Sequence, residues 1–453
     1  MGFMKIVDFL NDLLWGKLLI FLLLGTGIYY SIRLRFPQFR QIKRVNKQVF
    51  GDNIFKRGAK ADKDGMSSFQ ALATAIAAQV GTGNLAGVAT AIASGGPGAV
   101  FWMWMSALFG MGTIFAEAVL AQVYTERIDG EVVGGPAYYL RKGTNSKFLA
   151  GFFAISIIIA LGFVGNMVQS NSIAVALDSA FNIPPLVGGI IAAVIAALIF
   201  IGGLTRIASF TELVVPFMAI LYIVGSLIIM VLNYTEIIPA FKLIFTSAFS
   251  AKAVAGGAAG VAVKEAVRYG ISRGLFSNEA GMGSTPHAHA VAKVDHPAEQ
   301  GLVAIFGVIF DTLIICTITA LINIMMGGHT SGLTGIEMTQ SSFAAGLGNF
   351  GTIFIAISLF FFAFSTIIAW YYFGEANIKY LFGTKGLTPY RILVIIFIVL
   401  GSALTVEAVW DLADLFNGLM VLPNIVGLLI LSPQVIKILN DYENNFLKNE
   451  KIK

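Results

Sequence analysis

Long apolar runs separated by short polar segments make up most of the 453-residue chain. A helix that crosses a bilayer needs about 20 mainly apolar residues, so each long run predicts a membrane-spanning helix. We find eleven such runs, at residues 14–34, 68–94, 98–124, 148–178, 184–204, 209–232, 253–291, 299–326, 347–378, 387–405 and 408–431. Few residues remain outside them, which predicts an all-α integral membrane protein with a single transmembrane domain over residues 1–453.

The composition agrees with this pattern, because 57% of the residues are hydrophobic and only 12% are charged. Charged residues make up about a quarter of a typical soluble domain, so a soluble globular chain is excluded. The net charge of +5 is small, and the basic segment 33–63 holds few aromatic residues and follows a membrane helix directly. We therefore expect this segment to face the lipid bilayer and to bind no nucleic acid. The single Cys316 lies in an apolar run and is expected to be a small buried side chain.

Lysine and arginine residues lie mainly in alternate loops, which predicts how the chain crosses the membrane. Cytoplasmic loops are enriched in these residues, and ten of them stand between residues 33 and 63. With that segment in the cytoplasm, an odd number of spans places the other basic loops on the same side. We therefore expect a multi-pass protein of the cell membrane, with its amino terminus outside and residues 433–453 as a cytoplasmic tail.

The second apolar run is interrupted in its middle, where residues 79–87 read Gln-Val-Gly-Thr-Gly-Asn-Leu-Ala-Gly. Non-helical backbone is tolerated at this depth only inside the protein or beside a cavity. Close helix packing through small residues does not explain why Thr82 and Asn84 flank Gly81 and Gly83. A dinucleotide-binding loop does not fit either, because the third glycine comes one position late and no strand precedes it. We predict a discontinuous helix here.

A second interruption occupies residues 270–284 in the seventh run, where glycines again stand among serine, asparagine and glutamate residues. The two interruptions are five runs apart. Corresponding Gly-interrupted segments in two halves indicate a transporter with inverted repeats and a binding site at the membrane midplane. We predict a first repeat at residues 67–233, a second at 252–432, and an additional N-terminal helix at 14–34.

A broken helix exposes backbone groups of both polarities. The half that starts near Thr82 points unpaired N–H groups and the positive end of its dipole at the break, which suits a carboxylate. The half that ends near Val80 leaves carbonyl oxygens, which suit a cation or an ammonium group. A zwitterionic amino acid uses both halves, whereas a simple inorganic ion uses one.

The ninth run adds two neighbouring hydroxyl groups, on Ser365 and Thr366. Hydroxyls in membrane helices commonly bond back to carbonyls of the preceding turn. With carbonyls from the first interruption they would instead form an uncharged oxygen cage for a monovalent cation such as Na⁺, and the lack of a dedicated carboxylate argues against a divalent ion. Trp370 lies one turn beyond Thr366 on the same face. It is a candidate wall of the substrate pocket, with core packing as the alternative.

Taken together, residues 79–87, 274–281 and 364–366 resemble the alanine or glycine:cation symporter family, the sodium:alanine symporters, and the likeness extends over essentially the whole chain. The family is similar to the LeuT-type transporters, in which five-plus-five inverted repeats surround a midplane site. The resemblance implies secondary active uptake of small neutral amino acids, chiefly alanine and glycine, coupled to Na⁺ or in some members to H⁺.

The resemblance also implies site residues in this chain. The residues at the substrate carboxylate would be Gln79, Thr82, Gly83 and Asn84. The sodium ligands would be the carbonyl oxygens of Ala77 and Val80 and the hydroxyls of Ser365 and Thr366. Further substrate contacts would come from Asn166, Met167, Gln169, Phe276, Ser277, Asn278 and Trp370.

Ionisable residues at membrane depth are expensive and count as functional candidates. We interpret Arg268 and Arg273 as gate or helix-pairing charges, and Glu279 or Asp311 as the proton carrier if coupling uses H⁺. The sequence places His287, His289 and His296 near the inner end of the seventh run. A His-x-His pair does not share a helix face and makes a poor metal site, so we expect these histidines in a cytosolic loop.

Other function classes fit the sequence less well. A gated channel for small solutes would need continuous rings of polar residues along its pore. An enzyme is not expected, because there is no HExxH motif and no Ser/His/Asp grouping in one region. Na⁺ is the expected coupling ion, no organic cofactor is expected, and the protein is expected to act as a monomer.

Overall fold

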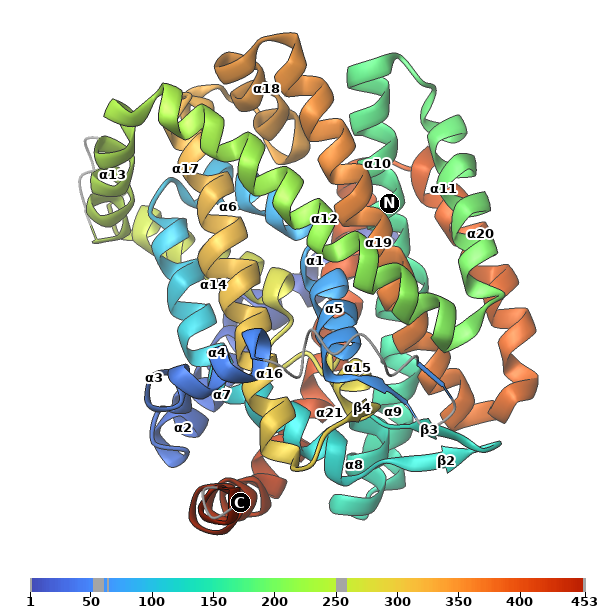
Figure 1. Ribbon diagram of the computed structural model, residues 1–453. Helices are drawn as coiled ribbons and strands as arrows, with labels where there is room; N and C mark the ends of the chain where they lie inside the picture. Colours follow the sequence, from blue (N-terminus) through green and yellow to red (C-terminus); the bar gives the residue numbers. More distant parts are fainter. Residues whose placement is uncertain (1, 52–60, 63–64, 250–258, 451–453) are drawn as a thin grey trace.

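The computed structural model is almost entirely helical, and it describes residues 2–51, 61–62, 65–249 and 259–450 (Figure 1). The N-terminal part contains α1 (Gly2–Leu13), α2 (Leu19–Arg33), α3 (Pro37–Arg40) and α4 (Ile42–Phe50). Next come β1 (Met66–Ser67), α5 (Ser68–Gln79), α6 (Val88–Gly95), α7 (Ala99–Val123), β2 (Glu126–Ile128), β3 (Glu131–Val133), α8 (Pro136–Gly143), α9 (Lys147–Ile157), α10 (Asn166–Phe181), α11 (Pro185–Phe200), α12 (Gly203–Leu232) and α13 (Ile237–Phe249). The remaining elements are α14 (Ala259–Asn278), α15 (Pro286–Ala290), β4 (Ala292–Lys293), α16 (Pro297–Val308), α17 (Thr317–Met325), α18 (Gly335–Leu347), α19 (Asn349–Phe382), α20 (Leu387–Ala403), α21 (Val406–Asp441) and α22 (Leu447–Glu450).

Several helices are long and apolar enough to cross a bilayer. Six such stretches occur among the described residues: Ala99–Val123, Lys147–Phe181, Gly203–Leu232, Pro297–Met325, Asn349–Ala403 and Val409–Phe446. Ser68–Gln79 and Gly83–Gly95 meet at a bend of 48° and make a seventh span if they are counted together. Asn349–Ala403 covers two of the predicted runs, and residues 253–258 of another lie outside the described residues. The all-helical, multi-pass architecture is therefore confirmed, whereas the count of eleven stays a prediction.

The helices pack through close backbone contacts as well as through apolar side chains. α7 packs against α14 and α16, and α10 packs against α19 and α20. A Cβ atom on Gly270 of α14 would lie 2.3 Å from the carbonyl oxygen of Ala99, which only glycine avoids. Small residues at such crossings let helices in a membrane approach closely.

Two short sheets lie at the same end of the molecule. β2 and β3 form an antiparallel hairpin, and β1 pairs in parallel with β4. In Figure 1 this end, with α8 and the C-terminus, is at the bottom, while α13 and α18 are at the top. The β1–β4 pairing matters for the site, because it joins the start of α5 to the segment that precedes α16.

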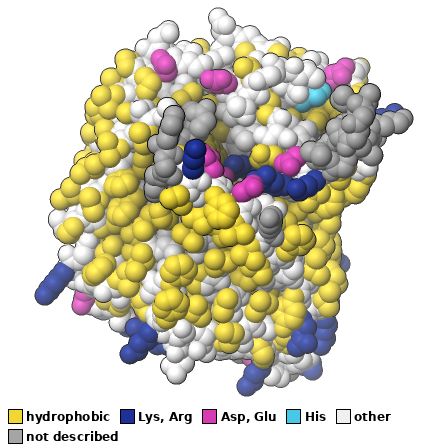
Figure 2. All heavy atoms as spheres, turned by 180° about the vertical axis from the view of Figure 1, so that it is seen from behind, with side chains coloured by type: hydrophobic (Ala, Val, Ile, Leu, Met, Phe, Trp, Pro, Cys, Tyr) yellow, Lys and Arg dark blue, Asp and Glu magenta, His cyan; other side chains and the backbone are white. Residues whose placement is uncertain are grey.

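The outer surface carries a broad apolar belt, which Figure 2 shows across one face. On α12 the exposed apolar side chains include Phe217, Ile220, Val224 and Val231. A belt of this kind suits contact with lipid tails, in agreement with the apolar runs of the sequence. The upper part of the face in Figure 2 is hollowed, and acidic and basic side chains gather around the hollow.

Candidate functional site

The chain is interrupted near the middle of the molecule at the first predicted place and in the later part of the second, because residues 270–278 of the predicted stretch 270–284 remain helical. α5 ends at Gln79, and helical structure resumes at the π-helical turn Gly83–Gly87, so residues 80–82 form a first break. α14 ends at Asn278 and α15 begins at Pro286, so residues 279–285 form a second break. Gln79 Nε2 donates to the carbonyl oxygen of Asn278 over 2.7 Å, and this bond places the two breaks side by side.

At the first break, two backbone N–H groups donate to side-chain oxygens instead of to carbonyl oxygens of a helix. Gly81 N donates to Asn84 Oδ1 over 2.8 Å, and Thr82 N donates to Gln169 Oε1 over 3.2 Å. These N–H groups lie at the positive end of the helix that starts at Gly83, where anions bind favourably. The two amide oxygens therefore stand where a carboxylate would be stabilised.

Carbonyl oxygens gather on the other side of the same break. Thr366 Oγ1 lies 2.8 Å from the carbonyl oxygen of Ala77, 3.4 Å from that of Val80 and 3.5 Å from that of Ala78. The carbonyl oxygen of Phe362, one turn earlier on α19, is 3.0 Å away. A hydroxyl has a single proton to donate, so this cluster holds more acceptors than donors and is suited to a small cation.

Ser365 shares only the Phe362 carbonyl oxygen with this cluster. Its hydroxyl donates to the carbonyl oxygen of Phe362 and lies 3.3 Å from the sulfur of Met218. Successive residues of a helix point about 100° apart, so Ser365 and Thr366 face different neighbours. Both hydroxyls therefore bond back to the preceding turn, and Thr366 alone of the two also contacts the carbonyl oxygens of α5.

Three buried polar atoms at the ends or inside the breaks find no hydrogen-bond partner among the described residues: Gln79 Oε1, Thr82 Oγ1 and Thr285 Oγ1. Asn166 Oδ1 on α10 is a fourth such atom, and each of these residues is at most 2% exposed. Buried polar groups in proteins are nearly always hydrogen-bonded. Unpaired atoms on three of the predicted site residues therefore indicate where a polar ligand would bind.

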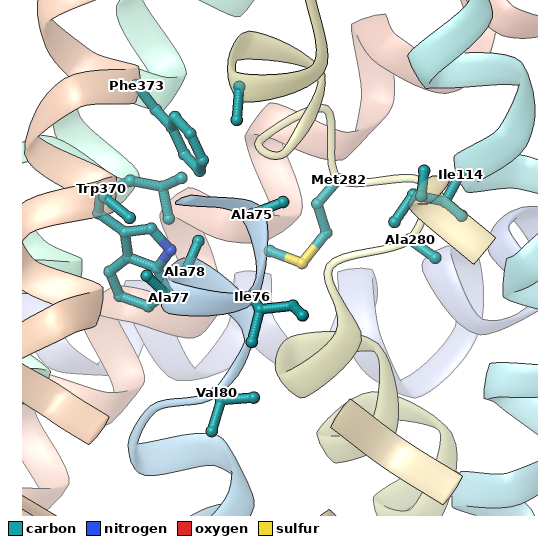
Figure 3. Packing of buried hydrophobic residues seen from close by; sticks show 14 of the residues in the cluster. Ala75, Ile76, Ala77, Ala78, Val80, Ile114, Ala280, Met282, Trp370 and Phe373 are labelled. Atoms are coloured by element: carbon teal, nitrogen blue, oxygen red, sulfur yellow. The ribbon is translucent and has the colours of Figure 1, made fainter. Parts of the chain in front are cut away.

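Aromatic side chains enclose the site. Phe276 lies edge-on to Trp370 with ring centroids 6.2 Å apart, and it is 5.2 Å from Trp410. A Cβ atom on Gly83 would lie 3.2 Å from Ser277 and 3.4 Å from the Phe276 ring. Figure 3 shows the indole of Trp370 beside Ala77 and Ala78 of α5. The space next to the first break is thus bounded by rings and small residues.

The predicted residues of the fourth run lie at different distances from the breaks. Gln169 contacts the first break directly, as described above. Asn166 donates to Gly162 of its own helix, and only its Oδ1 is left for another group. Met167 packs in a small cluster with Val409 and against Gly401. Because Trp410 packs against this cluster and also contacts Phe276, Met167 lies behind the aromatic wall.

Besides Glu279 of the second break, two buried carboxylates belong to the site, although neither is among the predicted substrate contacts. Asp311 accepts hydrogen bonds from Asn84 Nδ2 (2.6 Å) and from Ser277 Oγ (3.0 Å). Glu117 of α7 accepts hydrogen bonds from the backbone N–H groups of Gly281 and Gly283, both over 2.9 Å. The signal for Glu117 was present in the sequence, because it is an acidic residue within an otherwise apolar run.

Two sequence-based expectations change. His287 and His289 are each 1% exposed, so they do not lie in an exposed cytosolic loop. Both histidines lie in α15. Their side chains are held by hydrogen bonds, between His287 and Asn377 and between His289 and Gln300. Cys316 is buried as predicted, but its neighbours are polar: its sulfur lies 3.3 Å from Asn84 Nδ2 and from Ser277 Oγ.

A cavity of about 270 Å³ lies beyond the aromatic wall, toward α18. Its lining includes Thr90, Asn171, Arg273, Glu337 and Trp410. The guanidinium of Arg273 forms two 2.9 Å hydrogen bonds to the carboxylate of Asp414 and lies 5.0 Å from the Trp410 ring. Because Trp410 also contacts Phe276, this layer separates the cavity from the first break.

Proteins of known sequence resemble the chain over its whole length. A sequence model of the sodium:alanine symporter family matches residues 1–453. A sodium/alanine symporter of Methanococcus maripaludis is 44% identical over 99% of this chain and 100% of that protein. A Bacillus subtilis protein assigned as a sodium/glutamine symporter is 44% identical over 96% of this chain and 90% of its own length. Another from Bacillus subtilis, described as a sodium/proton-dependent alanine carrier, is 42% identical over 96% and 91%.

Solved structures share the fold at low sequence identity. MhsT in complex with L-phenylalanine matches with a TM-score of 0.57 and 15% identity, over 84% of this chain and 99% of that chain. A manganese transporter of Eremococcus coleocola matches with a TM-score of 0.54 and 16% identity, over 82% and 78%. These likenesses show a LeuT-type transporter fold.

We predict that Glu117 stabilises the second break. Replacing Glu117 with alanine leaves two buried N–H groups without an acceptor, at roughly 1–3 kcal/mol for each, so thermal unfolding of the purified protein should shift down by several degrees. Glu117→Gln keeps one acceptor oxygen and should lie between the alanine variant and the unchanged protein. Equal unfolding temperatures for all three proteins would contradict the role assigned to this carboxylate.

Proposed function

The chain belongs to the sodium:alanine symporter family, and from this membership we propose that it couples inward movement of Na⁺ to uptake of small neutral amino acids such as alanine and glycine. It is a membrane transporter and not an enzyme. The observation that carries the proposal is the first break, which presents N–H groups on one side and a carbonyl cluster around Thr366 on the other.

The substrate's carboxylate binds at the N–H groups of residues 81–83, in place of the amide oxygens that now accept from them. Thr82 Oγ1 and Gln79 Oε1, both buried without a described partner, supply further polar contacts. Phe276, Trp370 and the alanines of α5 limit the side chain to a small apolar group. Asn166, Gln169, Ser277 and Asn278 complete the proposed shell around the amino acid, and Met167 supports it from behind.

Na⁺ binds among the carbonyl oxygens of Ala77 and Val80 and the hydroxyl of Thr366. These ligands are uncharged oxygens, as a site for a monovalent ion requires, and they come from both α5 and α19. Binding of the ion therefore holds the first break against α19. Each Na⁺ that moves inward through about 100 mV releases roughly 2.3 kcal/mol, which corresponds to about fifty-fold accumulation of the substrate.

H⁺ coupling is the second candidate, and Asp311 favours it. This carboxylate is fully buried, and none of the ion pairs among the described residues involves it. A carboxyl group buried in this way is either protonated or balanced by a bound cation. One relative is described as a sodium/proton-dependent carrier, so Asp311 would carry the proton if this protein works in the same way.

The proposed architecture has eleven spans, with residues 14–34 as an additional helix, 67–233 and 252–432 as inverted repeats, and residues 433–453 as a cytoplasmic tail. A single chain contains every proposed ligand, so we propose that a monomer is functional.

Alternating access requires that one side of the site opens while the other closes. On the β-sheet side, β1 pairs with β4, Lys293 forms a 2.9 Å ion pair with Asp62, and Ser68 Oγ donates to Gln300. On the opposite side a cavity reaches the layer formed by Arg273 and Trp410. We propose that the β1–β4 pairing closes the cytoplasmic side in this state and separates when the site opens inward.

The sodium site predicts different effects for two neighbouring hydroxyls. Thr366→Ala removes a ligand, and the loss of one ion–oxygen contact should raise the Na⁺ concentration needed for half-maximal alanine uptake by about ten-fold or more. Ser365→Ala is the matched control and should change it by less than about two-fold, because its hydroxyl bonds to Phe362 and Met218 and not to α5. A Thr366→Ala protein with the Na⁺ dependence of the unchanged protein would refute the site.

The orientation is testable at the two ends of α19, since the buried Cys316 is the chain's single cysteine. Asn349→Cys should react with a membrane-impermeant maleimide in intact cells. Lys385→Cys should react only after the cells are permeabilised. The reverse pattern would show that the amino terminus is cytoplasmic.

A further inference from the structure

Glu279 is a buried carboxylate that the proposed symport cycle leaves without a role. It is the first residue of the second break and is fully buried. None of the ion pairs among the described residues involves it. Its two oxygens are bonded to uncharged donors: Trp370 Nε1 donates to Oε1 over 2.6 Å, and the Ser284 hydroxyl donates to Oε2.

The backbone at this position disfavours a side chain. Glu279 has a φ of +59°, in the left-handed region where glycine is accommodated without strain. Glycines occupy the other left-handed positions of the same segment, Gly281 and Gly283. A glycine would suit this backbone conformation better. We therefore infer that the glutamate stands at position 279 because of the hydrogen bonds that its carboxylate makes.

The carboxylate of Glu279 binds the indole of Trp370, which bounds the proposed substrate pocket. Trp370 is 2% exposed and lies edge-on to Phe276. A Cβ atom on Gly165 would lie 2.7 Å from the indole, and Figure 3 shows Ala77 and Ala78 beside the same ring. Packing thus confines the indole, while a directional bond to a carboxylate fixes the direction of its N–H edge.

We propose that Glu279 is a positioning residue that sets substrate size by holding Trp370 against the first break, with Ser284 fixing the carboxylate from the other side. The claim deepens the proposed function and rests on it. With the bond intact, the indole occupies the space that the side chain of a larger amino acid would need. Without it, the ring turns within its packing and the pocket accepts bulkier neutral side chains.

The central comparison is between two variants of Glu279. Glu279→Gly removes the carboxylate and keeps the left-handed backbone without strain, so it isolates the loss of the bond. Glu279→Gln retains an oxygen for the indole N–H and an amide for the Ser284 hydroxyl. The readout is the ratio of the concentrations of unlabelled leucine and unlabelled alanine that halve uptake of radiolabelled alanine.

We expect the preference for alanine over leucine to fall about ten-fold in Glu279→Gly and to stay within about two-fold of the unchanged protein in Glu279→Gln, since a pocket that discriminates by size does so by factors of this order. Trp370→Phe, which keeps a ring without an N–H, should resemble Glu279→Gly. Combining Trp370→Phe with Glu279→Gly should add nothing further, because both changes remove the same bond.

A merely structural role would give another result. An unchanged preference in Glu279→Gly, equal losses in the glycine and glutamine variants, or additive effects in the double variant would each overturn the proposal. If Glu279→Gly does not fold, Ser284→Ala provides the test, because it frees one carboxylate oxygen and should lower the same preference by a smaller factor; no change there would overturn the proposal as well.

Binding measurements distinguish a failure of the symport proposal from a failure of the claim about Glu279. If the unchanged protein binds no neutral amino acid in a thermal-shift assay, the symport proposal and the size claim fall together. If it binds alanine and yet Glu279→Gly keeps the original preference, only the claim about Glu279 falls.

Discussion

The need to hydrogen-bond every peptide group inside a membrane determines where the helices of this molecule can be interrupted and which side chains must lie beside the breaks. An unpaired N–H or carbonyl group in hydrocarbon costs several kcal/mol, so two helices can open at mid-depth only where other groups bond the exposed backbone. Here those groups are amide oxygens from Asn84 and Gln169, the hydroxyl of Thr366 and the carboxylate of Glu117. The same requirement makes the breaks useful, because an amino acid and a cation can take the places of these internal partners.

Three buried carboxylates, Glu117, Glu279 and Asp311, lie in or beside the second break, and each makes a different connection. Glu117 binds backbone N–H groups, Glu279 binds Trp370 of α19, and Asp311 joins Asn84 of the first break to Ser277 of α14. None of them is ion-paired among the described residues. Buried carboxylates without an ion-pair partner are balanced by a proton or by a bound cation, and both are ions that a carrier of this family could couple to transport.

Much of this arrangement was predictable from the sequence because glycines and polar residues in apolar runs have few structural explanations. That reasoning located the first break and part of the second and set Thr366 beside the carbonyl groups of the first one, whereas Gln169 was expected only from the family resemblance, as a substrate contact. It was less able to separate Ser365 from Thr366, since helix rotation relative to α5 decides which hydroxyl meets the carbonyls. The burial of His287 and the role of Glu117 were missed, because each depends on residues 90 or more positions away, Asn377 for His287 and Gly281 for Glu117. Side-chain pairings over such separations are set by tertiary packing, which a local pattern does not encode.

The central claim is that the two breaks bind an amino acid together with Na⁺ and carry both across the membrane. The most direct measurement is uptake of radiolabelled alanine into liposomes that contain the purified protein, with an inward gradient of Na⁺, an inward gradient of H⁺, or neither. The account predicts transient accumulation above the external concentration when the Na⁺ gradient is imposed. Accumulation with the H⁺ gradient alone would transfer the coupling role to a protonatable group such as Asp311. Uptake that is the same under all three conditions would contradict symport.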